Sequence, residues 1–337
     1  MRAVCQWLGL LLLCVAMVGC GEGKKGDSEN SDDPNNSGGG AGAVKLDKGT
    51  IGISVQALSN PFFKVIADTV EVEANKHGYK VLKRDAENKV ANQNNQVEEF
   101  IVSRVDAIIL CPRDTKAIGE VIRKANDAGI PVFTIDTICE IKEAKVVFHV
   151  GTDNLQGGEV AGQAMIDALG KGGGEVAVLE LKKVDSCVDR VTGFTKVIDA
   201  YNETAENKIT IVTHLECEGD KAKGQVAARD AMSAHADLRG IFAINDPAAL
   251  GARAALEAEG KADQIVVIGF DGQPEGKQGV KDGKLFDTPT QFPARMSIEC
   301  VKAIMKYFDG EKIEPKSLLL DTAPYRKADA DKDPSLK

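Results

Sequence analysis

The stretch Ile265-Val266-Val267-Ile268-Gly269-Phe270-Asp271-Gly272 runs four consecutive apolar residues directly into a polar turn. Ala107-Ile108-Ile109-Leu110 is a second run of the same kind. A strand whose residues are all apolar has both faces covered, which is typical of parallel sheets that lie between helices. These stretches therefore predict an α/β protein.

Apolar runs of this kind alternate with helical patterns along the chain, in two series. The expected strands are 50–56, 79–83, 106–110 and 131–135, then 146–150, 175–180, 208–213, 240–244 and 265–269. Helix signals fall between them, because Asn60 can cap a helix with Pro61 at its first position. The expected fold is thus a doubly wound parallel sheet, which binds ligands at the carboxyl ends of its strands.

The N-terminus has the pattern of an export signal. The apolar run 7–18 has about twelve residues, whereas a membrane-spanning helix needs roughly twenty. Met17-Val18-Gly19-Cys20 resembles a bacterial lipoprotein cleavage site, so we expect 1–19 to be a signal peptide and Cys20 to carry lipid. A plain signal peptide cut nearby is the alternative. Residues 20–46 are rich in Gly, Ser, Asn and Asp and predict a flexible linker.

Length and composition narrow the class of protein. A chain of 337 residues predicts two domains, and a formal net charge of −9 disfavours nucleic acid as a partner. The single tryptophan, Trp7, lies in the expected signal peptide, so aromatic stacking in the mature protein falls to Phe or Tyr.

Five cysteines follow the expected lipidation site, namely Cys111, Cys139, Cys187, Cys217 and Cys300. An odd number leaves at least one of them unpaired within the chain. A Cys111–Cys139 or a Cys187–Cys217 disulfide is possible in an oxidising compartment. The spacing in the sequence does not establish either pairing.

Familiar catalytic and cofactor motifs are missing from the sequence. It has no GxGxxG after a strand, no GxxxxGK[ST], no GxSxG and no HExxH, so we expect no catalytic residue, metal or cofactor. Asp329, Asp331 and Asp333 start like a calcium loop, but Pro334 stands where such a loop needs glycine. We expect 328–337 to be a disordered tail.

Polar groups and phenylalanines recur just after the expected strands. They include Gln56, Asn60, Phe62, Phe63, Asp136, Arg190, Asn245, Phe270 and Asp271, with Gln291 further on. Sugar hydroxyls both donate and accept hydrogen bonds, so carboxylates, amides and a guanidinium can saturate them, while an apolar sugar face can lie on a Phe ring. The pattern favours a small polyhydroxylated ligand.

Several short motifs together resemble the periplasmic ribose-binding protein family, the pentose- and hexose-binding type I solute receptors of ABC transporters. The resemblance covers about residues 48–327. The motifs are Ser59-Asn60-Pro61-Phe62-Phe63, Thr134-Ile135-Asp136, Gly151-Thr152-Asp153-Asn154, Arg190 with Gly193-Phe194, Asn245-Asp246 and Gly269-Phe270-Asp271-Gly272.

The resemblance implies two Rossmann-like lobes joined by a three-segment hinge, which close on the ligand. The N-terminal lobe is expected to comprise 47–151 plus 292–320, and the C-terminal lobe 152–291 plus 321–327. The chain should cross between them near 151–153, 290–292 and 320–322.

The resemblance also implies which residues contact ligand. They are Asn60, Phe62, Phe63 and Asp136 from one lobe, and Arg190, Asn245, Phe270, Asp271 and Gln291 from the other. Three positions depart from ribose receptors: Thr137 replaces an Arg, Gln56 replaces a small hydroxyl residue, and Gly219 stands where an aromatic is usual. A different pentose, a hexose, a furanose or a sugar alcohol is therefore open.

The expected function is that of a lipid-anchored periplasmic receptor, a monomer that delivers a small sugar to an ABC permease and, through it, to the ATPase. A receptor that presents a sugar or furanosyl signal to a membrane sensor is the alternative. A lactose-repressor-type regulator would need a DNA-binding segment before the first strand. An enzyme would need a nucleophile–base pair beside Asp136, Asp271 and Arg190.

Overall fold

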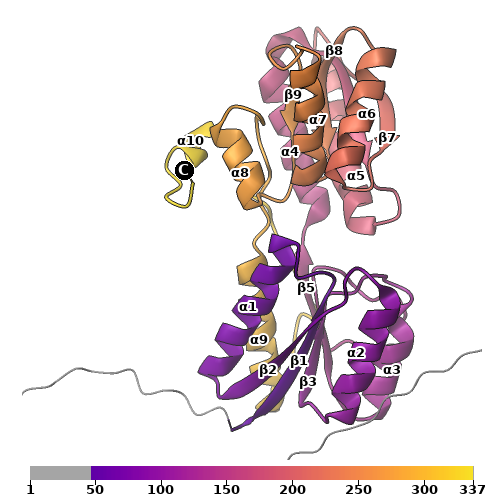
Figure 1. The fold of residues 1–337 in the computed structure, drawn as a ribbon, viewed down its shortest axis with the longest axis vertical. Coiled ribbons are helices and arrows are strands. Elements are labelled where there is room, and N and C mark those ends of the chain that lie inside the picture. Colours follow the sequence, from indigo (N-terminus) through magenta and orange to yellow (C-terminus); the bar gives the residue numbers. More distant parts are fainter. Residues whose placement is uncertain (1–46, 337) are drawn as a thin grey trace, which may run out of the picture. The chain divides into compact units, whose positions relative to one another are not determined.

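The computed structural model describes residues 47–336, which contain two parallel sheets flanked by helices (Figure 1). The expected signal peptide, Cys20 and the linker lie outside the described residues. The described part is an α/β protein with two parallel-sheet lobes, so the predicted fold class is confirmed.

The first sheet has the strand order β10-β5-β4-β3-β1-β2, and every pairing in it is parallel. Its strands are β1 (Gly49–Val55), β2 (Tyr79–Asp85), β3 (Ala107–Leu110), β4 (Val132–Ile135), β5 (Phe148–Thr152) and β10 (Ser317–Leu320). Its helices are α1 (Pro61–Lys76), α2 (Val90–Val102), α3 (Ile118–Asp127) and α9 (Pro293–Phe308). We call this sheet with its helices the N-terminal lobe.

The second sheet has the order β7-β6-β8-β9 and is also parallel throughout. Its strands are β6 (Gly174–Glu180), β7 (Ile209–Glu216), β8 (Leu238–Ala243) and β9 (Val266–Ile268). Its helical elements are α4 (Asn154–Leu169), η1 (Gly170–Gly172), α5 (Asp185–Thr204), α6 (Lys221–Ala234), α7 (Asp246–Ala258), α8 (Pro274–Lys281) and α10 (Lys327–Ala330). We call this part the C-terminal lobe.

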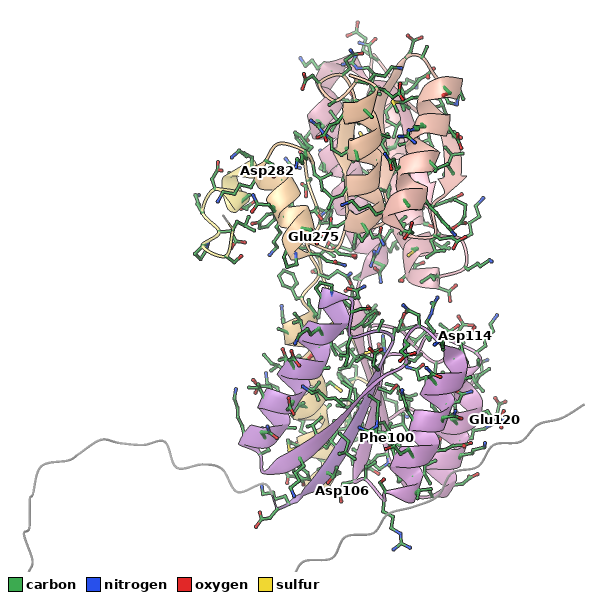
Figure 2. The ribbon with its side chains drawn as sticks, in the orientation of Figure 1. Phe100, Asp106, Asp114, Glu120, Glu275 and Asp282 are labelled. Carbon is green, nitrogen blue, oxygen red and sulfur yellow. The ribbon has the colours of Figure 1, made fainter. Side chains whose placement is uncertain are left out.

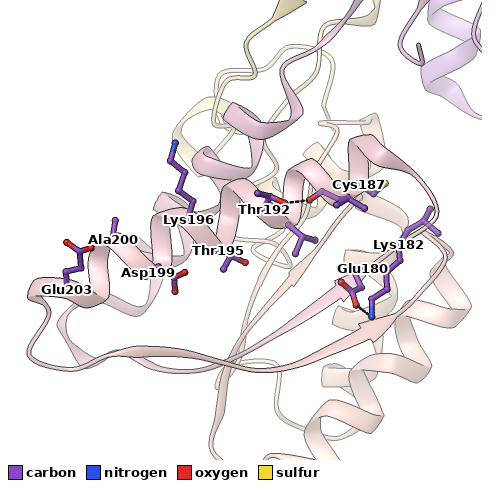
Figure 3. Close-up of a pocket in the computed structure, with 12 residues that line it drawn as sticks. Glu180, Lys182, Cys187, Thr192, Thr195, Lys196, Asp199, Ala200 and Glu203 are labelled. Carbon is purple, nitrogen blue, oxygen red and sulfur yellow. Dashed lines mark hydrogen bonds and ion pairs between the residues drawn. The ribbon is translucent and has the colours of Figure 1, made fainter. Parts of the chain in front are cut away.

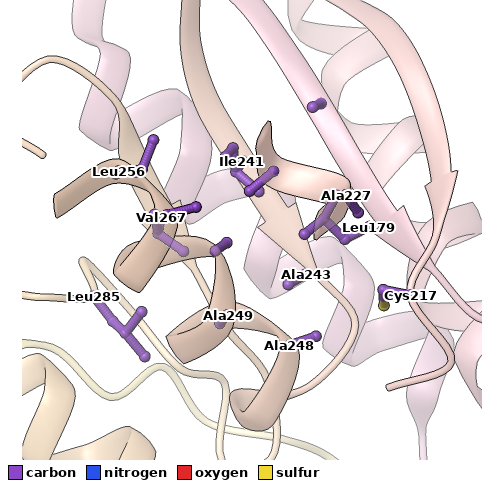
Figure 4. Close-up of a cluster of buried hydrophobic side chains, with 14 of the residues drawn as sticks. Leu179, Cys217, Ala227, Ile241, Ala243, Ala248, Ala249, Leu256, Val267 and Leu285 are labelled. Carbon is purple, nitrogen blue, oxygen red and sulfur yellow. The ribbon is translucent and has the colours of Figure 1, made fainter. Parts of the chain in front are cut away.

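Alternation along the strands divides each lobe into two cores. In β6, Ala177 and Leu179 join the cluster with α6 and α7 (Figure 4), whereas Val176 and Val178 join the cluster with α4 and α5. Successive side chains of a strand point to opposite faces, so an all-apolar strand supplies both cores. The N-terminal lobe repeats this plan, with α1 and α9 on one face and α2 and α3 on the other.

Two aspartates that flank β3 accept hydrogen bonds from backbone amides of the N-terminal lobe. Asp106, just before β3, accepts a hydrogen bond from the Thr50 amide of β1 at 2.7 Å (Figure 2). Asp114, beyond the other end of β3, accepts from the amides of Lys116 and Ala117 before α3. These amide hydrogen bonds lower the pKa of Asp114.

The chain passes between the sheets three times. It leaves the first sheet after β5 and enters α4, returns after Gln291 to α9, which packs on α1, and leaves again after β10. The passages are hydrogen-bonded to one another, since the Asp153 amide donates to Leu320 O at 2.9 Å and the Thr290 amide to Ala323 O at 2.7 Å. The sheets are thus joined by adjacent segments from distant parts of the sequence.

Two expectations need correction. Strand β10 was not predicted; it is a short, half-exposed edge strand that depends on pairing with β5. The expected disordered tail is also wrong for residues 328–336, because they include most of α10, and the Tyr325 hydroxyl donates to Asp333 Oδ2 at 2.7 Å. Leu336 packs against the core of the C-terminal lobe.

Helices α4 and α5 approach each other backbone to backbone. A Cβ on Gly158 of α4 would lie 2.1 Å from the carbonyl oxygen of Arg190 on α5. A Cβ on Gly193 would lie 2.0 Å from the carbonyl oxygen of Leu155. Only glycine at both positions allows this approach, which sets where the Arg190 side chain starts.

We predict that Gly158→Ala lowers the free energy of unfolding by about 1–3 kcal/mol, because the new methyl group must displace the Arg190 carbonyl. Gly172→Ala is the matched control, since a Cβ there meets no heavy atom within 4 Å, and it should change stability by less than about 0.5 kcal/mol. Urea unfolding of both variants measures the difference, and equal effects would contradict close packing of α4 on α5.

Candidate functional site

The carboxyl edge of the first sheet carries three predicted residues in one hydrogen-bonded chain. Gln56, directly after β1, donates through Nε2 to Thr137 Oγ1 at 3.2 Å and to Pro112 O at 2.9 Å. Thr137 in turn donates to Asp136 Oδ2 at 3.2 Å. The structure therefore brings Gln56, Asp136 and Thr137 together.

Asp136 is an unusually basic carboxylate. Burial raises its pKa to about 6, and the negative charge of Asp271 adds to this, while Arg190 and the Thr137 hydroxyl oppose it. Arg190 and Asp271 belong to the C-terminal lobe, so the pKa of Asp136, in the N-terminal lobe, depends on charges from the other lobe. The next residue in the sequence, Thr137, is uncharged. The cation that lowers the pKa of Asp136 is Arg190, in the other lobe.

The C-terminal lobe contributes a buried ion pair. Arg190 on α5 donates from Nη1 to Asp271 Oδ1 at 2.9 Å and to Ile244 O at 2.7 Å. Its guanidinium carbon lies 3.9 Å from the ring centroid of Phe270. Burial raises the pKa of Asp271, and the hydrogen bonds from Arg190 and Gln291 oppose that shift.

Asp271 and Asp136 share a backbone feature. Their φ angles are 104° and 70°, on the side of the Ramachandran plot that non-glycine residues rarely occupy. Strained residues of this kind persist where the surrounding structure holds them, and they concentrate at functional sites. Asp136 follows β4 directly and Asp271 comes three residues after the end of β9, so both lie at the carboxyl edge of a sheet.

Gln291 completes the group on the C-terminal side. Its Nε2 donates to Asp271 Oδ1 at 2.6 Å, and its Oε1 accepts from Thr152 Oγ1 at 2.6 Å. Among the hydrogen bonds of residues 47–336, those of Arg190 come from Nε and Nη1, and Nη2 makes none. The site thus offers a guanidinium edge and two carboxylates to hydroxyl groups.

The predicted aromatic residues are all buried. Phe62 and Phe63 meet edge to face, with centroids 5.3 Å apart, inside the core of the N-terminal lobe. Phe270 is fully buried in the core that contains α4 and α5. The Phe270 ring also contacts a predicted polar site residue, because the Arg190 guanidinium lies over it.

Asn60 and Asn245 act as helix caps. Asn60 Oδ1 accepts from the Phe62 amide at 2.9 Å at the start of α1. Asn245 Oδ1 accepts from the Ala248 amide at 3.0 Å at the start of α7, and its Nδ2 donates to Gly219 O at 2.9 Å. Both asparagines therefore stabilise the start of a helix, whether or not they also contact a ligand.

Two buried residues at this edge were missed as site residues. Asn154 Oδ1 accepts from Arg190 Nε at 2.8 Å, and Asp246 accepts from the Thr288 hydroxyl at 2.6 Å and the Gln273 amide at 2.7 Å. Burial raises the pKa of Asp246 well above its usual value. Both residues come within three positions of the end of a strand, and this position could have marked them as site residues. The sequence does not show which groups their side chains bind.

A hollow of about 800 Å³ lies elsewhere on the C-terminal lobe, between α5 and the end of β6 (Figure 3). Thr192, Lys196 and Cys187 line it, and none of the predicted site residues does. The five cysteines within residues 47–336 are all free, so neither candidate disulfide forms. Residues 47–336 contain no cluster of three potential metal ligands and no helix long and apolar enough to cross a membrane.

Comparison with known proteins gives consistent matches. Residues 51–312 match the model of the periplasmic binding protein domain. The ribose import binding protein RbsB of Bacillus subtilis is 37% identical over 79% of this chain and 83% of its own length. The Escherichia coli protein of the same name is 33% identical over 81% and 90%.

Solved structures match the fold. An ABC transporter periplasmic solute binding protein from Actinobacillus succinogenes, with bound D-allose, has a TM-score of 0.78 and 29% identity, covering 85% of this chain and 100% of its own. A solute binding protein from Bacillus halodurans, with bound myo-inositol, has a TM-score of 0.75 and 25% identity, covering 86% and 98%.

We predict that Asp136→Asn stabilises the ligand-free protein at pH 7.5 by about 1–3 kcal/mol and has little effect near pH 4. The folded-state pKa of about 6 exceeds the ordinary value of 3.8, so folding favours the protonated acid. Below pH 4 the acid is protonated in both the folded and the unfolded wild-type protein, and its charge costs no stability. As the pH rises through 6 the buried carboxylate ionises and the wild-type protein loses stability, whereas the amide of Asp136→Asn does not titrate.

Urea unfolding at both pH values measures this difference, with the exposed Asp263→Asn as control. A variant that is less stable than wild type at pH 7.5 would show that Asp136 is not a strained charge.

Proposed function

The chain belongs to the periplasmic binding protein family, and from that premise we propose that it is the sugar-binding receptor of a carbohydrate ABC importer. The observation that carries the proposal is the buried Arg190–Asp271 pair, which has Gln291 on one side and the Phe270 ring beneath. A neutral polyol can form hydrogen bonds with both Arg190 and Asp271 and leave the ion pair between them intact.

The chemistry of the site supports a hydroxyl ligand. A sugar hydroxyl can donate to Asp136 or Asp271 and accept from Arg190 at the same time. Hydrogen bonds to charged groups contribute about 1.5–3 kcal/mol each, so several suffice to hold a small ring tightly. Because Asp136 lies in one lobe and Arg190 in the other, a bound sugar favours the arrangement in which both reach it.

Differences from ribose receptors in both lobes favour a sugar other than ribose. Thr137 supplies a hydroxyl where ribose receptors have an Arg, and Gln56 already binds that hydroxyl. Gly219 offers no ring, and its carbonyl is taken by Asn245. Compared with ribose receptors, the site lacks one guanidinium and one stacking ring. We therefore infer a different pentose, a hexose, a furanose or a sugar alcohol as the ligand.

The proposal extends to the whole chain. Residues 1–19 serve as signal peptide, lipidated Cys20 anchors the protein to a bacterial membrane in the periplasm, and 20–46 tether it. The lobes are assigned as 47–151 plus 292–320 and 152–291 plus 321–327, and residues 328–336 pack on the second of them. The closed monomer delivers its sugar to the membrane permease and so to the ATPase, and no residue acts as a catalyst.

A thermal-shift screen tests the proposal, because a ligand that binds only the folded state raises the melting temperature. The panel comprises pentoses, hexoses and polyols, including D-ribose, D-allose and myo-inositol. We expect a concentration-dependent rise with at least one member. No rise across the panel at millimolar concentrations would contradict sugar binding.

We predict that Asp271→Asn weakens binding of the sugar found in that screen by about 100-fold or more, since it removes a charged acceptor beside Arg190. Calorimetric titration measures the affinity, and circular dichroism confirms that the variant is folded. Lys196→Ala, on the same helix as Arg190 but exposed and paired with Glu159, should bind like wild type. Unchanged affinity of Asp271→Asn would refute the assigned site.

A further inference from the structure

Five side chains and one backbone carbonyl form a closed hydrogen-bond circuit around the ion pair. Arg190 Nε donates to Asn154 Oδ1 at 2.8 Å, and Asn154 Nδ2 donates to Thr152 O at 3.1 Å. Thr152 Oγ1 donates to Gln291 Oε1 at 2.6 Å, and Gln291 Nε2 donates to Asp271 Oδ1 at 2.6 Å. Arg190 Nη1 closes the circuit on Asp271 at 2.9 Å.

The circuit is largely shielded from water. Thr152, Asn154, Arg190 and Gln291 are 5%, 9%, 5% and 6% exposed. A buried polar atom that loses its partner has no water to replace it, so each bond of the circuit constrains the next. A substitution at one side chain of the circuit should therefore weaken hydrogen bonds between other members to which it is not directly bonded.

The circuit joins two of the three passages between the lobes. Thr152 is the last residue of β5, where the chain first leaves the N-terminal lobe, and Gln291 lies just before α9, where it returns. The third passage is held from the same turn of α4, because Gln156 Oε1 accepts from the amide and hydroxyl of Thr322 at 2.9 and 3.0 Å.

The Asn154 side chain is not needed to cap α4. Asp153 is the N-cap, and its Oδ1 accepts from the Gln156 amide at 2.9 Å. Asn154 instead spends its oxygen on Arg190 and its amide group on Thr152 O. Its contacts thus run from the hinge to the ion pair.

We propose that Thr152 and Asn154 are positioning residues that couple the hinge passages to the Arg190–Asp271 pair. Asn154 sets the guanidinium from the first passage, and Thr152 sets Gln291 on the second. The inference rests on the proposed function, in which Arg190 and Asp271 bind the sugar, because the circuit then makes hinge geometry depend on occupancy of that pair.

Amide hydrogen exchange of the purified, sugar-free protein tests the coupling. The probes are the amides of Asp271 and Gln291, which donate to Pro289 O and Asp271 O at 3.0 Å. Thr152→Val keeps the side-chain shape and removes one hydroxyl. We expect it to speed exchange of both amides about fivefold or more, because local opening of the second passage becomes easier, while Thr152→Ser retains wild-type protection.

Thr134→Val is the matched control. Thr134 is a buried threonine of the same sheet, and its hydroxyl bonds His149 Nδ1 at 2.9 Å outside the circuit. It should leave the Asp271 and Gln291 amides within about twofold of wild type. Equal acceleration by Thr134→Val, or by Thr152→Val at every amide of the protein, would overturn the proposal.

Asn154→Ala gives an independent test if Thr152→Val does not fold. The Asn154 side chain is hydrogen-bonded to Arg190 and to Thr152 O, and not to Gln291 or Asp271. We nevertheless expect the Gln291 amide, which donates to Asp271 O, to exchange about fivefold faster or more. Wild-type exchange there would overturn the coupling. Since no sugar is present, these results stand apart from the sugar screen, whose failure would instead refute the proposed ligand.

Discussion

The buried ion pair between Arg190 and Asp271 is the interaction on which the candidate site depends. Two charges removed from water are tolerated only when their remaining hydrogen-bonding groups are satisfied and the geometry is good. Asn154, Gln291 and the carbonyl of Ile244 supply those bonds, and the Phe270 ring faces the guanidinium. Loss of one member would leave a buried charge without compensation.

The fold delivers these groups to one place. In a parallel sheet all strands end at the same edge, so residues far apart in sequence meet there. Glycine at Gly158 lets α5 approach α4 closely enough for Arg190 to reach Asn154. Asp271 has a positive φ, and its carboxylate accepts a hydrogen bond from Arg190.

Local sequence was a good guide where the physical signal was local. The all-apolar strands and the cap at Asn60 predicted elements that the structure contains, because burial on both faces and capping leave a mark within a few residues. Strand β10 and the packed tail carry no such mark, since both depend on partners distant in sequence. Ser317–Leu320 pairs with β5, and Asp333 binds Tyr325.

The sequence by itself determined the fold class and the polar residue types that follow the strands, through periodicity, chain punctuation and resemblance to a known family. Only the tertiary structure decided which of them meet: that Asn154 holds Arg190, that Thr152 holds Gln291, and that Asp136 feels charges from the other lobe. The physical reason is that hydrogen bonds and desolvation act over a few ångströms of space, whatever the distance along the chain.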